Sequence, residues 1–149
     1  MPEKKTVAEA RKAKREGKAP STQAGAFVRE EIEHIRDGEH GARSAKQAIA
    51  IGLSKARRAG VKLPDPPQSA SARTKAGAKR DGARADKATR PSRARSRAAK
   101  AALEHEPHAA ASSTALSRHA KAAAKRRPAK ARSEAAKKAA RTRARRKAS

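Results

Sequence analysis

The sequence predicts a mostly α-helical protein, with one small two-helix hairpin between a basic leader and a long disordered tail. Nearly all the large apolar residues fall between residues 19 and 64, and they recur in steps of three and four. This spacing places them on one face of a helix. Alanine, lysine and arginine dominate elsewhere and supply too little apolar surface for a domain-sized core. We therefore expect three parts, residues 1–18, 19–64 and 65–149.

The leader, residues 1–18, has mixed charge, with seven Lys or Arg residues and three Glu. Its alanines and alternating charges favour a frayed helix, and Val7 is its only sizeable apolar residue. Gly17 and Pro20 are stop signals that end this helix.

The first helix of the hairpin is expected at about residues 21–37. Gly38 is well placed to end it in a left-handed conformation. Its glutamates Glu30, Glu31 and Glu33 are expected on the exposed face. The apolar positions that share its buried face are Ala24, Phe27, Val28, Ile32 and Ile35.

The second helix is expected at about residues 45–59. A capping box is expected to open it, in which the side chains of Ser44 and Gln47 each accept a hydrogen bond from the other's backbone N–H. The alternation in "QAIAIGL" would also suit a strand. The cap, the helical spacing that follows and the closing Gly60 favour a helix. A stripe of small residues around Gly52 would let the first helix approach closely, although Gly52 could also be a tolerated glycine in a weak helix.

The tail, residues 65–149, carries 25 Lys or Arg residues against six acids. Self-repulsion and the lack of a core predict that it is disordered alone. Alanine, lysine and arginine are nevertheless strong helix formers. Three segments between the prolines, residues 92–106, 112–127 and 129–148, are therefore expected to become helical when phosphates neutralise their charge.

Several function classes are disfavoured by composition. No cysteine is present, so neither a disulfide framework nor a thiolate zinc site is expected. The five histidines, including the pair in "HEPH", are interpreted as ordinary polar residues, so no metal or other cofactor is expected. The sequence offers no core to build a catalytic pocket, which argues against an enzyme. The longest apolar run is six residues, too short for a membrane span. A cytoplasmic location is expected.

The formal charge of +26 points to a polyanionic partner, and nucleic acid is the abundant one inside cells. Contacts from Lys and Arg to phosphate carry no base information. Phe27 is the single aromatic residue, which argues against stacking on unpaired bases and favours duplex DNA over RNA. A base-reading helix-turn-helix is disfavoured because the connection of about seven residues is too long. We therefore expect sequence-nonspecific binding and condensation of DNA in the nucleoid.

The candidate phosphate contacts lie on the second helix and in the tail. On the hairpin, an equally good interpretation is that these cations are simply solvated and favoured by the helix dipole. The candidates are Lys46, Arg57, Arg58, Lys62, Arg93, Arg95, Arg97, Lys125, Arg126, Arg127, Lys137, Lys138, Arg141, Arg143, Arg145, Arg146 and Lys147.

Two other function classes remain open. The apolar surface of the hairpin could bind a protein partner, which would make the chain an interaction adaptor with the tail as an extension. The basic chain could instead associate with RNA or the ribosome. A homodimer through the hairpin would hide apolar surface that a marginal hairpin leaves exposed.

Two resemblances accompany this interpretation. The end of the chain, "AKRRPAKARSEAAKKAARTRARRKAS", resembles the C-terminal tails of histone H1 and bacterial histone H1-like proteins. Residues 29–64, with "KQAIAIGLSKAR" as the distinctive part, are similar to a family of short, basic bacterial proteins classed as a domain of unknown function. The second resemblance implies a bacterial origin and the hairpin-plus-tail layout, but no functional residues.

Overall fold

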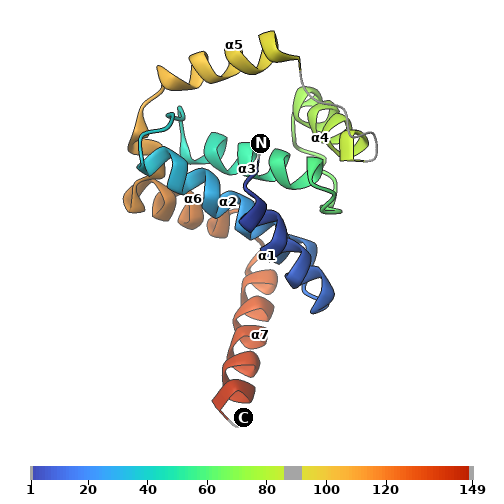
Figure 1. The fold of residues 1–149 in the computed structure, drawn as a ribbon. Coiled ribbons are helices and arrows are strands. Elements are labelled where there is room, and N and C mark those ends of the chain that lie inside the picture. The colour runs from blue at the N-terminus through green and yellow to red at the C-terminus, as the bar shows by residue number, and fades with distance from the viewer. Residues whose placement is uncertain (1, 86–91, 148–149) are drawn as a thin grey trace. The chain divides into compact units, whose positions relative to one another are not determined.

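Every regular element in the described part of the chain is helical (Figure 1). The structure is a computed structural model that describes residues 2–85 and 92–147. It divides into two units, residues 1–112 and residues 113–149. The elements are α1 (Lys4–Arg15), α2 (Pro20–Arg36), α3 (Ala45–Arg58), α4 (Ala72–Ala85), α5 (Arg93–Glu104), the 3-10 helix η1 (His108–Ala111), α6 (Ser113–Lys125) and α7 (Ala129–Lys147).

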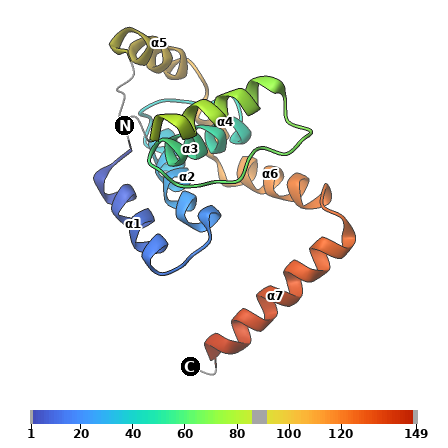
Figure 2. The same ribbon diagram turned by 90° about the vertical axis from the view of Figure 1, so that its right-hand side faces the viewer.

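The predicted fold class, a two-helix hairpin with a long disordered tail, is wrong. Helices α2 and α3 do form a hairpin close to the expected bounds, but three further elements pack on it. Helix α1 lies against α2, α4 lies along α3, and η1 contacts both hairpin helices (Figures 1 and 2). The reason is physical. A hairpin alone would leave much of its apolar surface in water, and these elements cover it.

Helix α1 is a packed element and not the frayed helix expected for the leader. Its Ala10 is buried in an apolar cluster with Phe27 of α2 and Ala56 of α3, and Val7 packs against that cluster. The helix ends where the sequence predicts, because Gly17 adopts a φ of 68° that few other residues tolerate. The buried side of α1 thus completes one half of the core.

Gly52 allows the backbones of α2 and α3 to approach closely, as the small-residue stripe predicts. A Cβ atom at this position would lie 2.7 Å from the Cα of Val28 and 3.0 Å from the carbonyl oxygen of Phe27. Carbon atoms do not approach so closely without a shift of the backbone. Close packing is therefore the reason for a glycine here.

The ends of the hairpin helices also follow the sequence. Gly38 and Gly60 have φ values of 80° and 89°, so both helices close with a left-handed glycine. At the start of α3, the Ser44 hydroxyl accepts a hydrogen bond from the Gln47 N–H at 3.3 Å. The Gln47 side chain reaches one residue further back than a capping box requires, and its Oε1 accepts from the Arg43 N–H at 3.1 Å.

A second core cluster contains residues that were assigned to the tail. Ala110 and Ala111 of η1 are buried with Ile35 of α2, Ala42 and Ala48. The preceding turn is bound to the loop after α2 by two backbone hydrogen bonds, from the Gly41 N–H to the Leu103 oxygen (2.8 Å) and from the Ala42 N–H to the Pro107 oxygen (3.1 Å). Residues 103–111 are therefore an integral part of the folded unit.

Gly41 lies at the tightest point of this contact. A Cβ atom there would overlap the carbonyl group of Glu106. The Arg36 Nε also donates to the Ala111 oxygen, at 3.0 Å. The segment is thus fixed at both of its ends.

Helix α4 was not predicted, because the stretch before it is rich in proline and serine and the helix contains Gly77 and Gly82. Its anchor on α3 is polar. The Ser54 hydroxyl donates to Asp81 Oδ2 at 2.6 Å, and Arg58 Nε lies 3.7 Å from Asp81 Oδ1. Polar anchors of this kind leave no apolar periodicity in the sequence.

Helices α5, α6 and α7 lie within the three tail segments that were expected to be helical only on binding. Their high content of alanine, lysine and arginine accounts for this, since these residues have the strongest intrinsic helix propensities. Pro128 separates α6 from α7. Within residues 113–149 the described part consists of α6, α7 and the short turn between them.

Candidate functional site

The unit of residues 113–149 presents a dense cationic surface. It contains fourteen Lys or Arg residues and one acid, Glu134. Every one of these cations whose side chain is described is exposed. The Nζ atom of Lys137 lies 3.3 Å from Glu134 Oε1. Because the cations point to all sides of α7 and no large apolar residue is present, this helix has no apolar face.

Most of the predicted phosphate contacts are exposed in the structure. On α3 and just after it, Lys46 and Lys62 are exposed. Arg146 lies in α7, but its side chain is outside the described part of the chain. The remaining exposed candidates are Arg93, Arg95 and Arg97 on α5, and Lys125, Arg126, Arg127, Lys137, Lys138, Arg141, Arg143, Arg145 and Lys147 in α6, α7 and the turn between them.

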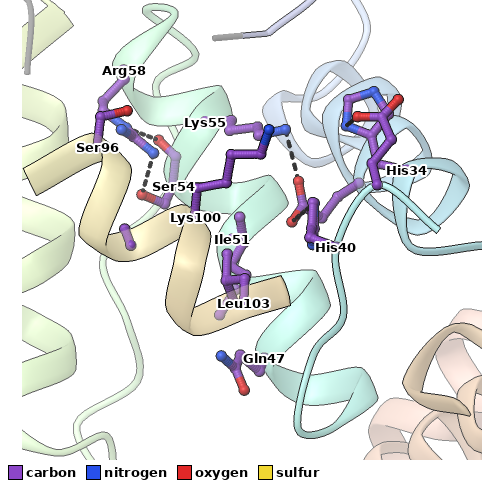
Figure 3. A pocket seen from close by; sticks show the side chains of 14 residues that line it. His34, His40, Gln47, Ile51, Ser54, Lys55, Arg58, Ser96, Lys100 and Leu103 are labelled. Carbon is purple, nitrogen blue, oxygen red and sulfur yellow. Dashed lines mark hydrogen bonds and ion pairs between the residues drawn. The ribbon is translucent and has the colours of Figure 1, made fainter. Parts of the chain in front are cut away.

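Two predicted contacts on α3 have partners within the protein. Arg57 is half-buried, and its Nη2 donates to the Pro64 carbonyl oxygen at 3.1 Å. Arg58 is exposed, and its Nη2 donates to the Ser54 hydroxyl at 3.1 Å (Figure 3). Its Nε lies 3.7 Å from Asp81 Oδ1. These arginines join α3 to the chain after it and to α4, so both guanidinium groups already have partners within the protein.

Further exposed cations were not singled out from the sequence. Charge counts alone identified the tail as basic but did not distinguish one cation from another. They include Lys100 on α5, Arg118 and Lys121 on α6, Lys130 and Arg132 on α7, Lys5, Arg11, Lys12, Lys14 and Arg15 on α1, and several cations on α4.

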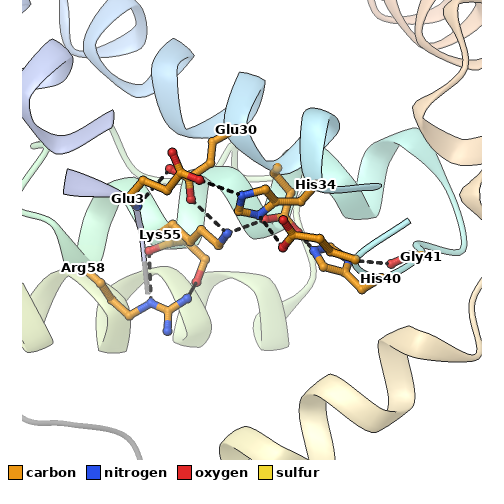
Figure 4. A network of polar contacts seen from close by, with 10 residues as sticks. Glu3, Glu30, His34, His40, Gly41, Lys55 and Arg58 are labelled. Carbon is orange, nitrogen blue, oxygen red and sulfur yellow. Dashed lines mark hydrogen bonds and ion pairs between the residues drawn. The ribbon is translucent and has the colours of Figure 1, made fainter. Parts of the chain in front are cut away.

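A second feature of the molecule is a buried polar cluster between α2 and α3 (Figure 4). Glu30 and Glu31 were expected to be exposed, yet they are only 4% and 0% exposed. Lys55 of α3 compensates both carboxylates, since its Nζ lies 3.3 Å from Glu30 Oε1 and 2.7 Å from Glu31 Oε2. The sequence missed this cluster because it gave no sign that other elements would cover the acidic side of α2.

Glu30 is ionised in this cluster. Burial by itself opposes ionisation, but a hydrogen bond from Thr6 and the charge of Lys55 outweigh it and lower the pKa of the Glu30 carboxyl. The backbone N–H of Glu3 also donates to Glu30 Oε2, at 3.3 Å. The leader and α3 thus both contribute to holding this charge.

Two histidines border the same cluster. His40 Nε2 lies 3.4 Å from Glu31 Oε1, and His34 Nε2 lies 3.4 Å from Glu3 Oε1. The Nδ1 atom of His34 lies 3.8 Å from Glu39 Oε2. The two rings are edge to face, with centroids 6.3 Å apart. Both were interpreted only as ordinary polar residues, yet their side chains are 15% and 14% exposed.

An open cavity of about 860 Å³ gives access to this cluster (Figure 3). Its walls come from α2, α3, α5 and the loop after α2. Glu31, His34 and His40 line one side, and Ile51 and Leu103 line another. The histidines are therefore reachable from solvent although they are mostly covered.

The fold and the charged surfaces together define an all-helical, strongly basic protein whose folded unit precedes two cationic helices. Residues 3–66 match a family described as "Family of unknown function (DUF6496)". The match covers α1, α2 and α3 and agrees with the resemblance of residues 29–64 to a domain of unknown function. Neither the curated proteins nor the solved structures gave a match. In the described residues, no helix combines the length and apolarity needed to cross a membrane.

Proposed function

We propose that this protein binds duplex DNA without sequence preference, through contacts from Lys and Arg to phosphates, and thereby condenses DNA in the manner of a histone H1-like protein of the nucleoid. The observation that supports this most is the surface of α6 and α7, which carries many exposed cations and only one acid. Cations in such numbers release counterions when they meet a phosphate backbone, and this release drives binding.

The form of the surface favours phosphate contacts over base reading. The cations of α7 lie on every side of a helix of 19 residues, with no Asn and no aromatic side chain among them. Arginine outnumbers lysine in the chain, 22 to 18, which suits bidentate contacts with phosphate. Duplex DNA is favoured over RNA because stacking on unpaired bases needs aromatic side chains.

A salt series tests the proposal. Fluorescence anisotropy with the full chain should give equal affinity for two unrelated duplexes of one length. The affinity should fall steeply with salt, with a logarithmic slope near −9 if about ten cations contact phosphate. A flat salt response, or a clear preference for one duplex, would contradict the proposal. A structured RNA that competes better than the duplexes would contradict the preference for DNA.

A pair of charge-matched variants locates the interface. Four cations of α7 are changed to glutamine, which keeps helix propensity nearly constant: Lys130, Lys138, Arg141 and Arg143. The control changes four exposed cations of α1 in the same way: Lys5, Arg11, Lys12 and Arg15. The α7 variant should make the salt slope less steep by about three to four, while the α1 variant changes it little. Equal effects would show that total charge, and not α6–α7, sets the affinity.

A further inference from the structure

Three metal-ligating side chains meet at the polar cluster beside α2. Glu31 and His34 are three residues apart on α2 and so lie on one side of the helix. His40 reaches them from the loop that follows. One donor atom from each of the three lies within 4.8 Å of the other two. We propose that Glu31, His34 and His40 form a binding site for a divalent transition-metal ion of the Zn²⁺ type.

Each histidine has one ring nitrogen in a hydrogen bond and the other facing the cluster. His40 Nδ1 lies 3.1 Å from the Gly41 carbonyl oxygen. Because a carbonyl oxygen only accepts, Nδ1 carries a proton, and in the neutral ring Nε2 keeps its lone pair for the side of Glu31. His34 Nε2 donates in the same way to Glu3 Oε1, which leaves Nδ1 with a lone pair. Partners of this kind orient imidazole ligands in metal sites.

The distances suit a tetrahedral ion. Ligands about 2.0–2.1 Å from Zn²⁺ lie about 3.3 Å from one another at tetrahedral angles. His40 Nε2 and Glu31 Oε1 are 3.4 Å apart, so this edge of the tetrahedron already has its length. A ligand atom of His34 lies within 4.8 Å of the other two, so this side chain has to move closer to complete the other edges. Glu39, whose Oε2 lies 3.8 Å from His34 Nδ1, or a water molecule would supply the fourth ligand.

The carboxylate of Glu31 supplies an independent reason for an ion. It is fully buried, and neither of its oxygens accepts an aligned hydrogen bond, although Lys55 Nζ lies 2.7 Å from Oε2. On the other side, Oε1 lies 3.4 Å from His40 Nε2, which carries a lone pair when the ring is neutral. Two acceptors at this separation repel each other unless a cation lies between them. A metal ion removes that repulsion, and Lys55 then serves to fix the second carboxylate oxygen.

The local charge also favours a cation. In a chain of net charge +26, Glu30 and Glu31 flank the ammonium group of Lys55, and the carboxylates of Glu3 and Glu39 lie next to His34. A divalent ion therefore enters a region that is locally negative. Two imidazoles favour zinc and its neighbours over magnesium or calcium, which prefer oxygen ligands. The open cavity beside the cluster provides the path for entry.

Titration of the full chain with Zn²⁺, followed by isothermal calorimetry, tests the site. We expect one ion per chain, with an affinity that a large excess of Mg²⁺ leaves unchanged. His34→Gln and His40→Gln should each weaken binding at least about tenfold. The matched control is His105→Gln, at an exposed histidine outside the cluster, which should bind Zn²⁺ as the wild type does. Absence of stoichiometric binding, or an equal loss in the control, overturns the proposal.

A second readout does not depend on heats of binding. Co²⁺ in a tetrahedral site of this kind absorbs strongly in the visible range, and the absorption should disappear in His40→Gln. Zn²⁺ should also raise the Tm of the wild type in proportion to the logarithm of its excess, but not that of His40→Gln. Circular dichroism of His40→Gln confirms that its helices are intact. If a proton on His40 satisfies Glu31 instead, the wild type shows neither the absorption nor the rise in Tm, and the proposal fails.

Discussion

Gly52 shows how one missing methyl group sets the distance between two helices. An alanine there needs space that the Val28 backbone occupies. Forcing extra atoms into a packed site costs about 1–3 kcal/mol. The better helix propensity of alanine returns only about 1 kcal/mol. We therefore expect Gly52→Ala to lower the free energy of unfolding, as measured by urea denaturation.

The control for Gly52→Ala lies on the partner helix. A Cβ atom at Gly25 of α2 would meet no other atom within 4 Å. Gly25→Ala should therefore stabilise the protein by up to about 1 kcal/mol through helix propensity alone. If Gly52→Ala were equally stabilising, Gly52 would be a tolerated glycine and close packing would not explain it.

Glu30 makes stability depend on pH. Its pKa is lower in the folded protein than in the unfolded chain, so its contribution is complete above the ordinary pKa of a glutamate. The contribution is lost as the pH falls through the lower, folded-state pKa. The wild type should therefore be more stable than Glu30→Gln at neutral pH, and the difference should shrink below about pH 4.

Urea denaturation at several pH values checks this expectation. Glu33→Gln, at an exposed position of the same helix, is the control and should change the stability little. A constant difference between wild type and Glu30→Gln over the whole range would show that Glu30 acts through packing and not through its charge.

At the scale of elements, Lys55 joins α3 to α2 by charge. Its side chain is 15% exposed and compensates two buried carboxylates. Removing one partner of a buried pair leaves the other charge without compensation, which costs about 3–5 kcal/mol. Lys55→Met should therefore lower the free energy of unfolding by about 3 kcal/mol or more. Lys46→Met, on the exposed side of α3, should change it by less than about 0.5 kcal/mol.

The elements that the sequence predicted well are those with local signals. The caps at Ser44, Gly38 and Gly60 and the close approach at Gly52 each follow from residues that are near one another in the sequence. The packing of η1 depends on Ala110 and Ala111, whose burial no spacing rule indicates. Alanine occurs throughout the chain, so the alanines that enter the core cannot be distinguished from those that stay outside it.

The polar cluster was missed for a related reason. Glu30 and Glu31 follow the pattern of an exposed helix face, but the chain around α1 covers Glu30, His40 covers Glu31, and Lys55 contacts both. Glu31 and His34 are three residues apart on α2, but His40 lies in the loop that follows, and no motif spacing connects it with them. Sites built from tertiary contacts leave little trace in a single sequence. The exposed cations, by contrast, follow directly from composition.

At the scale of the whole molecule, a net charge of +26 should make stability rise with salt. Like charges repel one another in the folded protein. Raising the salt from about 0.01 M to about 0.15 M shortens the Debye length from about 30 Å to about 8 Å. The Tm of the DNA-free chain should increase over this range, whereas the affinity for duplex DNA should decrease.

Thermal denaturation in sodium chloride and in potassium chloride checks this prediction. The two salts should act alike, because screening depends on ionic strength and not on the identity of the ion. A Tm that falls as salt is added would mean that favourable ion pairs, such as those of Lys55, outweigh the repulsion among the exposed cations.

Because residues 103–111 pack on the hairpin, the end of the family match and the end of the folded unit lie at different places in the chain. The stretch that matches the family ends at residue 66, yet Ile35 and Ala42 within it are covered by Ala110 and Ala111. A chain cut at residue 66 would keep α1, α2 and α3 and expose one side of their interior to water. The family match thus ends in the middle of a compact unit. A fragment meant to fold by itself should extend at least to residue 112.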